Sequence, residues 1–270
     1  MTPQPNEPPP AFRLDLSPSE RSAIAAVVGP LPDELALIVR DGRGAQFQRL
    51  EFLGDSVLDL VMNVHAVVEP GCRICQSVRG DVARLVTDHR LSQRATEAGV
   101  GSWLEWEASP QRLADLVEVC LAAAWLNGGW KPTTGFVDRV IHPLGEACER
   151  ALERSADPSL IATGSRVERR MGAALLELAS ARAVFAEDLT ADEGELSSRR
   201  ALLHRTSSVA GYAARAAVVS PVGGDAAVAD RVDAWLAATL LSDGADAALI
   251  AAARVIGRAP TSGLGYGAEQ

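Results

Sequence analysis

The chain of 270 residues is 47% hydrophobic and carries a net charge of −9, a length that suits one or two compact units. Its four cysteines are too few for a disulfide scaffold, and no apolar run approaches the roughly 20 residues that span a bilayer. The N-terminus shows no charged region leading into an apolar stretch, so we expect a cytoplasmic protein without a membrane anchor.

In the first half of the chain, the spacing of apolar residues and the positions of capping residues, Gly and Pro are typical of helices. Residues 1–16 are Pro-rich and polar, and we expect them to form a disordered tail. A helix should begin at Pro18, with Ser17 as its cap and Glu20 in its first turn. Further helices are expected over residues 32–40, 47–68, 78–99, 111–126 and 134–153, separated by Gly and Pro.

The second half repeats the first. Polar and turn residues at 154–158 predict a linker, followed by a second domain over 158–258 and a flexible tail over 259–270. The segment 113–129 is echoed by 228–244, and helices expected at 83–95 and 200–214 precede the two copies in the same order. This register indicates an internal duplication, and the absence of strand-like alternation predicts an all-α fold.

Two pairs of carboxylates lie at helical spacing. Glu51 and Asp55 are four residues apart, Asp115 and Glu118 are three apart, and each pair therefore shares one helix face. A single such pair is ordinarily a solvated surface, but apolar residues flank both, so the acids need water, arginine partners or a divalent cation. If the two helices cross, four oxygen donors converge into a site suited to Mg²⁺, with Mn²⁺ as a substitute.

Gly54 stands inside an otherwise strong helix, where glycine costs ~1 kcal/mol relative to alanine. Close approach of another helix or of a ligand would explain it.

These motifs resemble a known family. The stretch RLEFLGDSVL at 49–58 resembles the signature of ribonuclease III, and the segments 113–118 and 126–129 look like that family's second acidic helix and its end. The resemblance implies a helical endonuclease that cuts double-stranded RNA to 5′-phosphate and 3′-hydroxyl ends. It also implies four metal-binding catalytic carboxylates, namely Glu51, Asp55, Asp115 and Glu118.

The two halves depart from the family pattern in different places. An acidic position that often precedes the signature holds Gln48, and the family's middle acidic segment is weak at 75–81 but nearly intact at 192–200. The second half places Gly172 or Ala173 where Asp55 would fall, while Asp230 and Asp233 match Asp115 and Glu118. We expect one complete and one degenerate centre. The sequence leaves open whether Glu193, Glu195, Asp230 and Asp233 bind metal.

Family members act as dimers, and this chain could form that dimer internally. We expect two ribonuclease III-like domains, 17–153 and 158–258, packed as a pseudo-twofold pair. Phe52 would insert into the second domain, whereas its counterpart there is Arg169 or Arg170. With one competent centre, the expected outcome is one cut strand per binding event, and a homodimer would be needed for a staggered double cut.

RNA contacts would depend on arginines, because Lys131 is the only lysine. No double-stranded-RNA-binding domain is expected after the second helical domain. The candidate phosphate contacts are Arg79, Arg84, Arg90, Arg94, Arg199, Arg200 and Arg205, although a solvated face or an internal salt bridge explains each equally well.

Two other functions remain open from the sequence. A catalytically silent scaffold for structured RNA or a ribonucleoprotein fits the lost acids and the acidic net charge. In the other alternative, a helical protein-interaction module, the acid pairs would be ordinary solvated side chains on the surface.

Overall fold

The computed structural model describes residues 15–68, 87–141 and 166–258, and the regular elements within these ranges are all helices, which confirms the all-α prediction. The first half contains α1 (Pro18–Val27), α2 (Asp33–Asp41), α3 (Ala45–Val68), α5 (Asp88–Glu97), α6 (Pro110–Gly128) and α7 (Trp130–Val140). The second half contains α9 (Arg166–Glu187), α10 (Glu193–Leu203), α11 (Thr206–Ala216) and α12 (Asp225–Val255).

Side-chain caps fix where several of these helices begin. The Ser17 hydroxyl accepts a hydrogen bond from the Glu20 amide while the Glu20 carboxylate accepts one from the Ser17 amide, which forms a capping box at α1. Ser109 caps α6 in the same way, with Pro110 at the first helical position. The helix starts expected at Pro18 and near residue 111 are therefore correct.

Two helices expected to be continuous are broken. Thr87 caps α5 by accepting from the Arg90 amide, so a helix across 78–99 is wrong at this point. The helix expected at 200–214 is wrong as well, because α10 ends at Leu203 and α11 starts at Thr206. Helix α7 begins at Trp130, directly after Gly129 with its positive φ of 69°, and ends at Val140. The expected range was 134–153, of which residues 142–153 lie outside the described residues.

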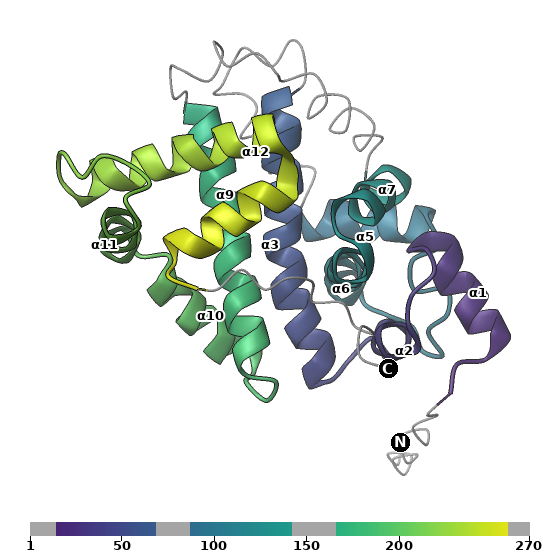
Figure 1. Ribbon diagram of the computed structural model, residues 1–270. Helices are drawn as coiled ribbons and strands as arrows, with labels where there is room; N and C mark the ends of the chain where they lie inside the picture. Colours follow the sequence, from purple (N-terminus) through teal and green to yellow (C-terminus); the bar gives the residue numbers. More distant parts are fainter. Residues whose placement is uncertain (1–14, 69–86, 142–165, 259–270) are drawn as a thin grey trace.

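Helices α3 and α9 lie against one another in the middle of the molecule (Figure 1). Helix α6 packs on α3 and is covered by α5 and α7, while α12 and α10 pack on α9. The buried hydrophobic side chains of both halves form one cluster. The two expected domains thus share a core within the described ranges, and their boundary at 154–158 lies outside those ranges.

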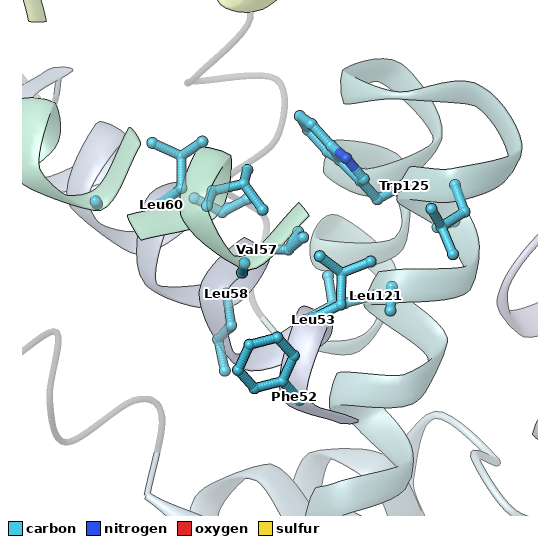
Figure 2. Packing of buried hydrophobic residues seen from close by; sticks show 14 of the residues in the cluster. Phe52, Leu53, Val57, Leu58, Leu60, Leu121 and Trp125 are labelled. Carbon is cyan, nitrogen blue, oxygen red and sulfur yellow. The ribbon is translucent and has the colours of Figure 1, made fainter. Parts of the chain in front are cut away.

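The α3–α6 contact carries the first-half site. Leu53 and Val57 of α3 and Leu121 of α6 are fully buried and pack beside Trp125 (Figure 2). A methyl group on Gly54 would overlap with the backbone carbonyl of Glu118 on α6, so the two helix backbones touch at this point. The close approach predicted from the glycine is confirmed.

The same contact recurs in the second half. A methyl group on Gly172 of α9 would overlap with the backbone carbonyl of Asp233 on α12. Gly172 is therefore the structural counterpart of Gly54, and Ala173 stands where Asp55 stands in the first half.

Arg49 joins α3 to the second half. Its side chain is buried, and it donates three hydrogen bonds to backbone carbonyls: Nη1 to Asp188 at 2.6 Å and Ala191 at 2.9 Å, and Nη2 to Phe185 at 2.8 Å. The last carbonyls of a helix lack partners within the helix. At the end of α9, the Arg49 guanidinium from the other half provides the hydrogen-bond donors that such carbonyls need.

Helix α12 is long and apolar enough to cross a membrane by length and composition alone. Half of its most apolar stretch is buried, and it packs on α9 and α11. Gly244, with φ 85° and ψ 176°, interrupts its helical geometry, as Gly129 separates α6 from α7 in the first half. Core packing explains its hydropathy.

Candidate metal centre

The α3–α6 crossing brings the two predicted acid pairs together. Glu51 and Asp55 lie one turn apart on α3, and Asp115 and Glu118 lie three residues apart on α6, beside the contact of Gly54 with the Glu118 backbone. The charges of Glu51, Asp55 and Asp115 all act on Glu118. The structure therefore gathers the four residues that the sequence singled out into one electrostatic cluster.

Burial and mutual repulsion disfavour the ionised form of carboxyl groups in this cluster. Desolvation raises the pKa of Glu118 to about 9, with Asp55 and Glu51 adding to the rise. Desolvation likewise raises the pKa of Glu51 to about 7, followed by the charge of Asp115. The pKa of Asp115 is raised mainly by burial, against the opposing effects of a hydrogen bond from Gln111 and the nearby charge of Arg112.

Two arginines lie at the edges of the cluster. Arg112 Nη1 of α6 is 3.4 Å from Asp115 Oδ2. Arg200 Nη1 of α10, in the second half, is 3.6 Å from Asp55 Oδ2 and donates to Ser56 Oγ at 2.8 Å. Arg200 also pairs with Glu177 of α9 at 3.0 Å. The second half thus reaches the first-half site.

The donor chemistry fits a hard divalent cation. Four carboxyl groups supply oxygen ligands of the type that Mg²⁺ and Mn²⁺ prefer, and a cation would favour the ionised forms of Glu51, Asp115 and Glu118, whose pKa values are raised. Within the described residues, no group of three or more His, Cys, Asp or Glu side chains is drawn together as a formed set of ligands.

Two further acids lie near the site: Asp88, which the sequence did not single out, and Glu193, which the sequence assigned to the second half. Asp88, in the first turn of α5, contributes to the raised pKa of Asp115 and Glu118. Glu193, at the start of α10, contributes to that of Glu51. The Glu193 segment is conspicuous in the sequence, but only the fold shows that it faces the other half.

Comparison with known proteins agrees with the motifs. The chain is 32% identical over 119 residues to Ribonuclease 3 of Symbiobacterium thermophilum, which covers 40% of this chain and 49% of the relative. It is 30% identical over 132 residues to Ribonuclease 3 of Azorhizobium caulinodans, and 30% identical over 134 residues to Ribonuclease 3 of Moorella thermoacetica. These matches cover 44% and 45% of this chain and 53% of each relative.

The chain is thus similar to ribonuclease III proteins over 40–45% of its own length. It spans about half the length of the curated relatives it matches. No family model matches it.

The second half of the chain carries a different charge arrangement. The Gly54–Gly172 correspondence places Arg169 at the position of Glu51 and Arg170 at that of Phe52. Arg169 Nε lies 3.9 Å from Asp230 Oδ2. Desolvation and then the charge of Asp230 raise the pKa of Asp233 to about 7, and Arg169 opposes this rise.

The four second-half acids that the sequence left open divide between two places. Glu193 acts on Glu51 of the first half, and Glu195 pairs with Arg199 on its own helix. Asp230 and Asp233 lie together on α12 beside Arg169. A guanidinium thus stands where the first half has a carboxylate.

Phe52 contacts the second half, as expected for the inserted residue of the family signature. Its ring is buried, and the Arg200 guanidinium lies 4.9 Å from its centroid. Of the candidate phosphate contacts within the described residues, Arg200 is the one that pairs with an acid of the cluster. Among the other candidates, Arg79 and Arg84 lie outside the described residues, Arg90, Arg94 and Arg205 are exposed, and Arg199 pairs with Glu195 and Asp188.

Proposed function

We propose that the chain is a metal-dependent endoribonuclease that cleaves double-stranded or structured RNA at the first-half centre, leaving 5′-phosphate and 3′-hydroxyl ends. The observation that carries this proposal is the meeting of Glu51, Asp55, Asp115 and Glu118 at the α3–α6 crossing. Two of these carboxyl groups have a pKa of about 7 and about 9, and strongly shifted pKa values are concentrated at functional sites.

The carboxylates would hold Mg²⁺, or Mn²⁺ in its place. Bound at this position, such an ion lowers the pKa of a water molecule and neutralises charge that develops on the attacked phosphate. The carboxylates of α3 and α6 would position the ion relative to the RNA backbone. Gln111 holds one oxygen of Asp115 through its 3.2 Å hydrogen bond, which limits the rotation of that carboxylate.

The two halves would form an internal pair of ribonuclease III-like domains, related by a pseudo-twofold axis near α3 and α9. This arrangement is supported by the matching contacts of Gly54 and Gly172 and by the direct packing of α3 on α9. With Ala173 and Arg169 in the second copy, one centre per chain is competent and one strand is cut per binding event. Assembly of two chains would permit a double cut.

The RNA would be recognised by the shape of its A-form helix and by its phosphates, since side chains cannot read the deep major groove. A net charge of −9 disfavours binding to a polyanion, so we expect weak and salt-sensitive association through local arginines. The chain would act in the cytoplasm.

Cleavage of an end-labelled perfect RNA duplex with Mg²⁺ or Mn²⁺ tests the proposal, with Asp55→Ala and Asp115→Ala alongside the wild type. Metal-dependent cleavage that both substitutions reduce by at least about 100-fold supports it. Activity that survives both substitutions would place the chemistry elsewhere.

A catalytically silent RNA-binding scaffold is the second candidate. The loss of the first acid pair from the second half and the acidic net charge favour it. Wild-type protein that binds duplex RNA but cleaves neither duplexes nor hairpins with either metal would establish this function instead.

A further inference from the structure

Two arginines stand against the first-half acids in the same manner, although they come from different halves of the chain. The Arg112 guanidinium lies 5.1 Å from the ring centroid of Phe47, and that of Arg200 lies 4.9 Å from the centroid of Phe52. Both phenylalanines belong to α3 and are buried. Stacking on a buried ring holds each guanidinium in place.

Each of these arginines lies beside one acid of the first-half centre, and the two acids come from different helices. Arg112 lies 3.4 Å from Asp115 on α6, and Arg200 lies 3.6 Å from Asp55 on α3. The side chains of Arg112 and Arg200 are 34% and 19% exposed, so both are partly withdrawn from solvent. Their acid partners differ, because the Asp115 side chain is 12% exposed and that of Asp55 is 59% exposed, so solvent screens the Arg112–Asp115 pair less than the Arg200–Asp55 pair.

A guanidinium keeps its charge at every accessible pH, so these two positive charges are permanent. In the absence of metal they offset part of the repulsion among the acids, as the lowering effect of Arg112 on the pKa of Glu51 and of Asp115 illustrates. A divalent cation that enters between the same carboxylates meets two positive charges a few ångströms away. The two arginines therefore stabilise the metal-free site and, for the same reason, lower its affinity for a divalent cation.

We propose that Arg112 and Arg200 are resident counter-charges that bracket the four-carboxylate centre and set its metal affinity by competing with the divalent ion. This inference rests on the proposed function, because it assumes that the same acids receive the metal. Since Arg200 belongs to α10, the second half would tune the metal requirement of a centre located in the first half.

Arg200 also has a structural role that the test must separate from its charge. It donates to Ser56 and pairs with Glu177, so its loss loosens the contact of α10 with α3 and α9. Lysine variants retain the positive charge without the planar fork, whereas glutamine variants retain hydrogen-bonding capacity without the charge. Comparison of the two distinguishes electrostatic competition from packing.

Mn²⁺ binding measured by isothermal titration calorimetry, without RNA, tests the proposal. We expect Arg112→Gln and Arg200→Gln each to lower the Kd for Mn²⁺ by about three- to tenfold, and Arg112→Lys and Arg200→Lys to remain within about twofold of the wild type. Arg199→Gln is the matched control, because Arg199 neighbours Arg200 on α10 but pairs with Asp188 and Glu195. Its Kd should stay near that of the wild type.

The outcomes separate this inference from the proposed function. Unchanged or weaker Mn²⁺ binding by both glutamine variants, with normal binding by the wild type, overturns the competition and leaves the metal centre intact. If the glutamine variants bind Mn²⁺ and the wild type does not, the competition is supported in its strongest form. If neither they nor the wild type differ from a non-binding Asp55→Ala variant, both proposals fail.

Discussion

Gly54 shows how a single missing side chain positions the site. Its backbone contacts the Glu118 carbonyl, and that contact sets how closely the two acid-bearing helices approach. Because a helix-interior glycine is intrinsically unfavourable, its presence here reflects the demand for close packing.

Gly54→Ala should therefore destabilise the protein, although alanine is the better helix former. We expect a loss of about 2–3 kcal/mol or more in the free energy of unfolding, since α3 and α6 must move apart. Chemical denaturation measures this, with Gly135→Ala as the control. Gly135 meets only the end of the Arg139 side chain, so this substitution should be neutral or stabilise by up to about 1 kcal/mol. Equal effects of the two substitutions would contradict the close contact.

Asp233 is half-buried in the second half, and its pKa rises from 3.8 to about 7. Between these values the folded protein retains a proton that the unfolded chain has released, so stability falls as pH increases from about 4 to about 7. The contribution of Asp233 to the free energy of unfolding is fully present below the pKa that this group has in the unfolded chain, and it is lost as pH rises toward the folded-state pKa.

Asp233→Asn should remove this dependence. Relative to the wild type, we expect the variant to gain stability progressively between pH 4 and pH 7, the window set by the Asp233 pKa shift. Urea denaturation at several pH values measures the difference. The exposed Asp243 on the same helix provides the control, and a flat difference between wild type and Asp233→Asn across this range would refute the raised pKa.

At the scale of elements, one arginine substitutes for a helix cap. Helix α9 ends at Glu187, and Arg49 of α3 binds the carbonyls of Phe185, Asp188 and Ala191 there. Arg49, a residue of the other half, thus completes the end of α9. If Arg49 is removed, the two halves lose the hydrogen bonds that they share here.

Arg49→Gln should lower the free energy of unfolding by about 3–5 kcal/mol, because three carbonyls at the interface lose their donor and the space is poorly filled. Arg43→Gln, at an exposed position just before α3, should change stability by less than about 0.5 kcal/mol. Thermal and chemical denaturation measure both. A small effect at Arg49 would mean that the halves do not depend on this contact.

At the scale of the whole molecule, the two halves are alike in backbone and unlike in charge. The glycine contacts match, but Arg169 faces Asp230 where the first half pairs carboxylate with carboxylate. The proposed chemistry therefore has one centre per chain.

A duplex labelled on both strands should accordingly be nicked and not cut through at low enzyme concentration. We expect Asp230→Asn/Asp233→Asn to keep cleavage within about threefold of the wild type, because these acids lie beside a guanidinium and away from the first-half centre. Native and denaturing gels of the same reaction distinguish nicks from double cuts. Loss of cleavage in this double variant would assign a catalytic part to the second half.

The sequence by itself determined the local features. Helix starts at Ser17 and Ser109 follow from caps that act within one turn, and the spacing of the acid pairs follows from the helical repeat. Gly54 predicted a close contact, because glycine inside a helix is intrinsically unfavourable and close packing explains its presence. The breaks at Thr87 and Arg205 were missed, because short-range propensity at those positions also permits a continuous helix.

Only the tertiary structure decided which distant groups meet. That Arg200 and Glu193 of the second half face the acids of the first, and that Arg49 completes the end of α9, depends on how α10 and α9 dock against α3. Docking results from the burial of many apolar side chains in a common core, and no local pattern encodes it. The identity of the acids was therefore readable from the chain, while their charged surroundings became visible only in the fold.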